Sequence, residues 1–217
     1  MIYEADIKNL LIKNAIHLIS EGGFEKATTK ELTYCSGHLP DYKMNEVYIY
    51  RFYGNKAGLY EAAFASLDAE LYDTFIDGIK AVGNFEGQTK EKLHEFVLIA
   101  WHFIMSNEER CRYYVRYYYS IYFKDISKEN HNKLFEKIVN EFSPLFKEEA
   151  DVPAILHSVF TAFLDFAIRV YNGDLEDNEE NRPHMFNVLY CMMVTYFKDE
   201  IVGEAHIPQP SQERNSI

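Results

Sequence analysis

Apolar residues recur at every third or fourth position along nearly the whole of this 217-residue chain. Between residues 3 and 21 this spacing places apolar side chains in one stripe along a helix. The stripe consists of Ile7, Leu10, Leu11, Ala15, Leu18 and Ile19. The alternation with a period of two that a half-buried strand requires is confined to residues 48–53,. The pattern therefore predicts an all-α fold.

Glycines, prolines and capping residues divide the pattern into about nine helices. Gly22 and Gly23 suit a helix C-terminus, and the run Thr28–Glu31 has the form of an N-terminal capping box,. Pro153 and Pro183 fall in first turns, where proline is tolerated,. The expected helices span residues 3–21, 28–36, 44–52, 55–81, 88–106, 108–123, 128–147, 153–172 and 182–200. Residues 203–217 are expected to form a flexible tail.

The composition is that of a folded, non-secreted chain. Hydrophobic residues make up 47% and charged residues 26%, with only 10 Gly and 6 Pro, which argues against disorder,. No apolar run approaches the roughly 20 residues of a membrane span, and the first residues lack the basic-then-apolar layout of a signal peptide,. Cys35, Cys111 and Cys191 lie far apart, which predicts reduced thiols and a cytoplasmic location,.

Charge is distributed unevenly along the chain. Residues 1–56 contain seven basic and seven acidic residues, so the whole net charge of −12 belongs to the remainder. Such a balance argues against a protein that coats nucleic acid without selectivity. A neutral first segment on an acidic body indicates that the first segment faces an anionic partner.

The first three expected helices have the arrangement of a helix-turn-helix unit, with a turn before the third. Residues 23–37 read GFEKATTKELTYCSG, and residues 49–60 read IYRFYGNKAGLY. The first stretch resembles, without a gap, the GYxxTTxxxIAxxAG segment of TetR-family transcriptional regulators. The second resembles the LYxxFxNKxxLx signature of the same family. By motif the resemblance covers about residues 5–65.

The resemblance implies a two-part organisation. Residues 1–56 are expected to form a helix-turn-helix DNA-binding domain, and residues 57–202 a larger helical domain for effector binding and dimerisation. In such regulators a small molecule enters the larger domain and shifts the two DNA-binding domains of a dimer apart. The expected function is therefore that of a repressor, which binds a near-palindromic operator with half-sites about 34 Å apart.

The spacing between the two motifs departs from the family pattern. Family members usually have about five residues between them, whereas eleven lie between Gly37 and Ile49, so His38 to Lys43 look inserted. Phe52-Tyr53 also reverses the usual order of the final aromatic pair. A longer turn can change the angle at which the third helix meets DNA.

Nine side chains are candidates for DNA contact. The hydroxyls of Thr28, Thr29 and Tyr50 can reach phosphate oxygens, and so can the ammonium groups of Lys43 and Lys56,. Four further side chains on the expected third helix can reach base edges, namely Asn45, Glu46, Tyr48 and Arg51,. The alternative is structural, with Thr28 acting only as a cap and Tyr50 or Phe52 packing into the core.

The body after residue 57 is rich in aromatic residues, which suits an apolar or aromatic effector with one or two polar handles. The candidate ligand-binding residues are Trp101, His102, Met105, Tyr114, Tyr117, Tyr118, Phe160 and Phe163. The alternative for each is core packing. The basic and aromatic stretch 110–119 is interpreted as a helix with tyrosines inward and arginines outward, with strand binding as its alternative,.

The last two expected helices are candidates for a dimer interface. Ala154, Ser158 and Ala162 repeat every fourth residue, and small side chains let helices approach closely,. Apolar side chains cover more than half of each helix. The complete candidate interface is Ala154, Ser158, Ala162, Phe166, Met185, Leu189, Met192, Met193 and Tyr196.

Other chemistries have little support in the sequence. The histidines never form an HxxxH motif, no GxSxG elbow exists, and the stretch 83–90 lacks the spacing of a phosphate loop,. We expect no enzyme activity, no metal and no cofactor. The competing hypothesis is a TetR-like fold that has lost DNA binding and serves as a ligand sensor or partner-binding dimer, which Glu46, the inserted residues and the neutral first segment favour.

Overall fold

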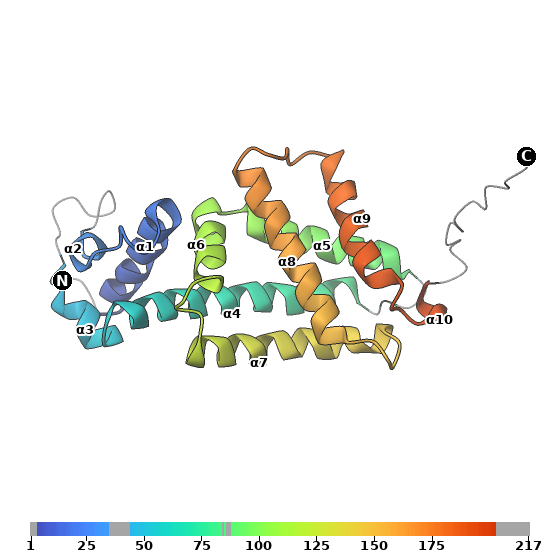
Figure 1. Cartoon of the computed structure of the whole chain (residues 1–217), viewed down its shortest axis with the longest axis horizontal. Coiled ribbons are helices and arrows are strands. Elements are labelled where there is room, and N and C mark those ends of the chain that lie inside the picture. Colours follow the sequence, from blue (N-terminus) through green and yellow to red (C-terminus); the bar gives the residue numbers. More distant parts are fainter. Residues whose placement is uncertain (1–3, 35–43, 84, 86–87, 203–217) are drawn as a thin grey trace, which may run out of the picture.

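One long helix, α4 (Lys56–Val82), runs along most of the molecule and connects its two ends (Figure 1). The structure is a computed structural model that describes residues 4–34, 44–83, 85 and 88–202. Within these residues it contains ten α-helices, a short 3-10 helix and no strand, so the all-α prediction is confirmed. Lys43, the inserted residues 38–43, Cys35 and the expected tail 203–217 lie outside the described residues.

Three helices pack together where α4 begins. They are α1 (Glu4–Gly22), the single turn α2 (Thr29–Leu32) and α3 (Val47–Tyr53). Leu11, Leu32 and Ile49 are completely buried between them. Burying each such side chain contributes about 1.5–3 kcal/mol, so these contacts hold the short helices α2 and α3 in place. We call α1 to α3 the head.

The remaining helices pack around the rest of α4 and form what we call the body. They are α5 (Thr89–Met105), α6 (Glu108–Tyr118), α7 (Asp125–Phe142), α8 (Val152–Tyr171), α9 (Asn181–Val194) and the short α10 (Asp199–Val202). Helix α7 lies along α4, and α8 and α9 form an adjacent pair (Figure 1). Helix α6 contacts both α4 and α1, so it touches head and body together.

Local chemistry explains where several helices begin and end. The side-chain oxygen of Asn55 accepts a 2.9 Å hydrogen bond from the Gly58 amide at the start of α4,. Thr28 caps α2 by accepting from the Glu31 amide at 3.2 Å, which confirms the expected cap. Gly54 ends α3 with a φ of 75°, a left-handed conformation that favours glycine,. The long α4 therefore starts directly after a sharp turn at α3.

Several expected helix bounds were wrong. The second expected helix, 28–36, is only one turn, and the sixth, 108–123, ends at Tyr118. The seventh ends at Phe142 instead of 147, because Pro144 lacks an amide hydrogen and the chain continues as the 3-10 helix Ser143–Leu145,. The expected helix 182–200 is divided into α9, which ends at Val194, and α10, so the described residues contain ten α-helices where about nine were expected.

The break after α9 is fixed by backbone pairing. The Lys198 amide donates to the Leu145 carbonyl at 3.0 Å, and the Lys147 amide donates to the Tyr196 carbonyl at 2.9 Å. The rings of Phe146 and Phe197 are buried against each other at 4.8 Å. A longer α9 would have needed the Lys198 amide and the Tyr196 carbonyl for hydrogen bonds within the helix. Because both are paired with the segment 145–147, the helix ends before them,.

The sequence predicts that no segment has the length and composition of a membrane span, but helix α8 meets both criteria. Among the described helices it alone is long and apolar enough to cross a membrane, a criterion that core helices of other proteins also meet. It packs against α6, α7 and α9, yet only 28% of its apolar stretch is buried. Its other apolar side chains, such as Ile155, Val159 and Phe166, are half-buried, and most of its exposed residues are polar or small.

Candidate functional site

Helix α3 presents one exposed face at the end of the molecule. Val47 and Tyr50 are 60% and 55% exposed, and Arg51 is exposed beside them. The opposite face carries Ile49, which is completely buried, and the half-buried Phe52. Tyr50 therefore does not pack into the core, whereas Phe52 does so in part. Sequence reasoning missed Val47, whose only signal was its place on the same helical face as Tyr50 and Arg51.

The guanidinium of Arg51 is held against α1. It lies 3.5 Å from the Glu4 carboxylate and 5.4 Å from the centre of the Phe52 ring. Both members of the ion pair are more than half exposed, so the pair contributes little to stability,. Arg51 can leave this position for another anion at low cost.

Three of the predicted DNA-contacting side chains also have local structural roles. Thr28 caps α2, as described above. Asn45 accepts a 2.9 Å hydrogen bond from the Val47 amide and so helps to start α3,. Lys56 donates to the Ala27 carbonyl at 3.2 Å, an oxygen that also accepts from the buried Tyr60 hydroxyl at 3.0 Å. The first turn of α4 is thereby fastened to the segment that precedes α2.

The other predicted DNA-contacting residues differ in exposure. Thr29, Glu46 and Tyr48 are half-buried, and the Tyr48 ring is stacked on Phe52 at 5.6 Å. Lys43 lies outside the described residues. Of the predicted DNA-contacting residues, Thr28, Asn45, Tyr50 and Arg51 are exposed, and the last two belong to α3.

The body contains an apolar cavity between five helices. The cavity has a volume of about 80 Å³. Its walls come from α4, α5, α7, α8 and α9. The lining residues are Tyr72, Phe75, Leu93, Phe96, Val97, Ala100, Phe135, Ile138, Phe142, Leu156, Val159, Phe160, Phe163, Leu189 and Met193. Apart from the Tyr72 hydroxyl, their side chains are entirely apolar.

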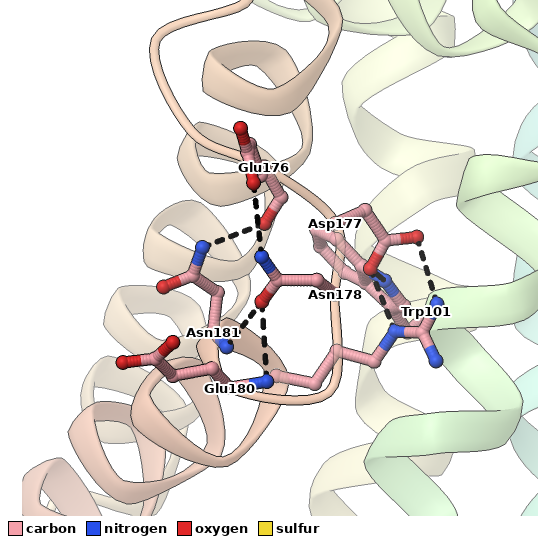
Figure 2. A network of polar contacts seen from close by, with 7 residues as sticks. Trp101, Glu176, Asp177, Asn178, Glu180 and Asn181 are labelled. Atoms are coloured by element: carbon pink, nitrogen blue, oxygen red, sulfur yellow. Dashed lines mark hydrogen bonds and ion pairs between the residues drawn. The ribbon is translucent and has the colours of Figure 1, made fainter.

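Of the eight predicted ligand-binding residues, Phe160 and Phe163 line this cavity. Trp101 is buried behind Phe163, with the two rings 5.7 Å apart. Its indole N–H donates to Asp177 at 3.0 Å, and Figure 2 shows the indole facing that carboxylate. His102 is exposed and Met105 is half-buried, and neither lines the cavity.

The Trp101 contact belongs to a polar network that ties the connection between α8 and α9 to α5 (Figure 2). Arg182 donates to the two Asp177 oxygens at 2.7 and 3.2 Å. This hydrogen bonding holds the pKa of Asp177 below its ordinary value. Asn178 and Asn181 add bonds to Glu176, so the connection is fixed by its own side chains.

The predicted tyrosines of α6 find partners inside the protein instead of lining the cavity. The Tyr114 hydroxyl donates to Asp68 at 2.7 Å, and the Tyr117 hydroxyl pairs with the Ser127 hydroxyl at 2.7 Å. Tyr118 is half-buried and stacks on Tyr114 at 6.2 Å. The interpretation that α6 turns its tyrosines inward is confirmed for Tyr114 and Tyr117.

The arginines of α6 lie at its outer edge and pair with the protein itself. Arg112 donates to Glu108 and to the Tyr171 carbonyl, and Arg110 pairs with Glu70 on α4. Arg116 is exposed. Two of these three charges are therefore already used to connect helices.

Asp68 is the centre of a buried polar cluster beside the cavity. Besides the Tyr114 hydroxyl it contacts Nδ1 of His131 at 3.0 Å, and both Asp68 and His131 are nearly inaccessible. The cluster connects α4, α6 and α7 through these three side chains. Burial, followed by the charge of Asp68, raises the pKa of Tyr114 well above its ordinary value, so this phenol stays protonated,.

The predicted dimer residues divide into two groups. Ala154, Ser158 and Tyr196 are exposed, and Ala162, Phe166 and Met192 are half-buried. Met185, Leu189 and Met193 are instead buried within their own chain, and the last two line the cavity. The reason is that α9 is apolar on nearly all sides, and its inner face packs on α5 and α8. The outer face of α9 also carries the exposed Val188 and the exposed Cys191, of which only Cys191 was not considered for the interface from the sequence.

The residues that the structure describes include no group of three His, Cys, Asp or Glu side chains placed to hold a metal ion. Neither a family model nor a curated protein matches the sequence. Comparison of structures, in contrast, finds many similar chains.

Most of the similar structures are described as TetR-family transcription regulators, and the others as a regulator and a repressor. A TetR family transcription regulator from Marinobacter aquaeolei VT8 has a TM-score of 0.65 and 14% identity, with 88% of this chain and 96% of that chain covered. The fatty acid degradation regulator FadR from Bacillus halodurans has a TM-score of 0.62 and 14% identity, with 83% and 96% covered. SmeT, the repressor of the Stenotrophomonas maltophilia multidrug efflux pump SmeDEF, has a TM-score of 0.57 and 14% identity, with 94% and 96% covered. The chain has the fold of TetR-family transcription regulators, as the resemblance of its two short motifs implied.

Proposed function

We propose that this chain is a DNA-binding transcription regulator whose head binds DNA through α3. The observation that carries the proposal is the exposed face of α3, where Val47, Tyr50 and Arg51 stand outward while Ile49 anchors the helix. A helix that exposes such a face at the end of a helix-turn-helix unit suits the major groove. Since one chain of similar fold is named a repressor, we propose that this chain also represses transcription, in the cytoplasm.

We further propose that two copies associate through the outer faces of α8 and α9. On α8 the half-buried Phe166 lies near the small residues Ala154, Ser158 and Ala162, and on α9 Val188 is 48% exposed. Burying this surface in a two-fold interface removes it from water and places two heads on one duplex. The expected operator is then a near-palindrome with half-sites about 34 Å apart.

The cavity is the proposed effector site of the regulator. It is apolar, it is formed by five helices, and one of them, α4, begins in the head at Lys56. A ligand that binds more tightly to one orientation of α4 than to another shifts the population toward the favoured orientation. We propose that this shift releases the protein from DNA.

A salt titration of DNA binding tests the proposal. Fluorescence anisotropy is measured with a labelled duplex taken from upstream of the protein's own gene, for the unaltered chain and for Lys56→Ala. We expect Lys56→Ala to weaken binding on every duplex and to lower the salt slope by about one phosphate contact. Lys56→Gln removes the charge but keeps a polar side chain with N–H donors, and it should lower the slope equally.

Lys80→Ala is the matched control for this experiment. Lys80 lies on the same helix as Lys56 but at the far end, where it pairs with Asp77 at 3.0 Å. Its removal should leave the salt slope unchanged. A slope that is the same for Lys56→Ala and for the unaltered chain would contradict the phosphate contact.

The competing proposal is a dimeric ligand sensor of the same fold that does not bind DNA. It is favoured by the absence of net charge in residues 1–56 and by the ion pair that holds Arg51 on Glu4. Failure to bind any duplex at low salt, together with ligand binding in the cavity, would establish this alternative.

A further inference from the structure

The Tyr72 hydroxyl is a buried polar group without a partner. Tyr72 is 2% exposed, and its oxygen is the single buried side-chain nitrogen or oxygen, among the described residues, that lacks a hydrogen bond. Leaving such a group unpaired costs about 1–3 kcal/mol, so native proteins rarely do so without a reason. The same residue lines the apolar cavity.

The surroundings of Tyr72 leave the cavity as the place for a partner. The ring is in edge contact with His131 at 5.6 Å and with Phe75 at 5.8 Å. The nearby Asp68 is already engaged with Tyr114 and His131. Burial, then the charges of Asp68 and Tyr118, raises the pKa of Tyr72 far above its ordinary value of 10.0. The phenol therefore remains a neutral hydrogen-bond donor at every physiological pH.

The walls of the cavity exclude charge. No Lys, Arg, His, Asp or Glu lines it, and the nearest turn of α4 carries the carboxylate of Asp68. A charged group placed here would lose its hydration without gaining a counter-charge, which is costly. A carboxylate ligand would in addition lie near the Asp68 carboxylate.

We infer that the cavity selects a neutral, largely apolar molecule that presents one hydrogen-bond acceptor to the Tyr72 hydroxyl. This inference rests on the proposed function for its biological meaning, since the ligand would be the effector. The acceptor is a carbonyl, ether or hydroxyl oxygen at one point of an otherwise hydrocarbon surface. A cavity of about 80 Å³ fits a small or slender molecule better than a bulky one,.

Three probes of similar size test the selectivity by isothermal titration calorimetry at pH 8. They are propylbenzene, which has no acceptor, propiophenone, which has a neutral carbonyl, and 3-phenylpropanoate, which is an anion. We expect propiophenone to bind about fivefold more tightly than propylbenzene, the effect of one net hydrogen bond. The anion should bind at least 100-fold more weakly than propiophenone.

Tyr72→Phe removes the hydroxyl and keeps the ring. The affinity for propiophenone should fall to that for propylbenzene, whose own affinity stays the same. The melting temperature of the ligand-free variant should equal or exceed that of the unaltered chain, because an unpaired buried hydroxyl is lost.

Tyr114→Phe is the matched control, because Tyr114 is equally buried but donates to Asp68 and does not line the cavity. It should lower the melting temperature and leave the ratio of ketone to hydrocarbon affinity unchanged.

Four results would overturn the inference: no binding of the neutral probes at millimolar concentration, a ketone preference that survives Tyr72→Phe, an anion that binds as tightly as the ketone, or a melting temperature that falls in Tyr72→Phe. The proposed function fails separately. If the ketone preference depends on Tyr72 but the protein binds no duplex, the cavity chemistry stands and the regulator proposal does not.

Discussion

Tyr50 and Tyr72 are the same residue type in opposite settings. Tyr50 stands on the outer face of α3 and is 55% exposed, whereas Tyr72 is 2% exposed and lies in the wall of the cavity. Water can hydrogen-bond to the hydroxyl of an exposed tyrosine at no cost. The buried Tyr72 hydroxyl can form a hydrogen bond only with a molecule that enters the cavity. Under the proposed function, the head would bind with groups that are already solvated, whereas the body would bind by removing a small apolar surface from water.

The largest effect is expected where a buried polar group of the body loses its partners. Asp68→Ala leaves the Tyr114 hydroxyl and His131 buried without their acceptor. We expect a loss of about 3 kcal/mol in the free energy of unfolding, measured by urea denaturation. Asp68→Asn keeps an acceptor for Tyr114 and should lose less. An unchanged midpoint in Asp68→Ala would show that this cluster does not stabilise the body.

An intermediate effect is expected at the exposed face of the head. Tyr50→Ala should weaken binding to the upstream duplex about tenfold, which corresponds to about 1.4 kcal/mol, and change the free energy of unfolding by less than about 0.5 kcal/mol. Tyr119→Ala is the control, because Tyr119 is 61% exposed but lies on the body after α6. Equal losses of affinity in the two variants would remove the assignment of DNA binding to α3.

The smallest energetic effect is expected for the cysteine thiols, whose reaction with a reagent measures how accessible each sulfur atom is. In Cys35→Ser, Cys111 should not react with Ellman's reagent at pH 8, because burial raises the pKa of its thiol from 9.0 to about 12 and keeps it protonated. The stability that this group provides is present below pH 9 and is lost as the pH rises toward 12.

Cys191 is the second thiol in that measurement, and it tests the dimer. It lies exposed on the outer face of α9 in the single chain. In a dimer isolated by size-exclusion chromatography it should react much more slowly than a free thiol peptide. A dimer in which Cys191 reacts at the rate of the peptide would place the interface elsewhere.

The fold could be predicted from the sequence because helical periodicity and capping are local. Thr28, Asn55 and the glycines around them mark helix ends within a few residues of the observed positions. Where the bounds were wrong, a tertiary contact decided them. The pairing of residues 145–147 with 196–198 ended α9 early, and no local pattern contains that contact.

The site could be predicted less well, because lining a cavity is a property of packing. Tyr114 and Tyr117 have the same aromatic spacing as a cavity wall, but partners on α4 and α7 already occupy their hydroxyls. Tyr72 escaped notice because it sits next to Leu71 in an ordinary apolar stripe. Only the packing of five helices shows that, among the described residues, its hydroxyl is buried without a hydrogen-bond partner.

The length of α4 has a mechanical consequence. Tyr72 lies sixteen residues after Lys56, a distance of roughly 24 Å along a helix,. If the helix pivots at the cavity as a rigid lever, a tilt of about 5° moves its first turn by about 2 Å. In a dimer with two-fold symmetry, the first turn of α4 moves by the same distance in both copies. The separation of the two heads therefore changes by up to twice the displacement of one helix. Under the proposed function, a ligand of a few carbon atoms would change the distance between the two heads, to which a rigid duplex cannot adapt.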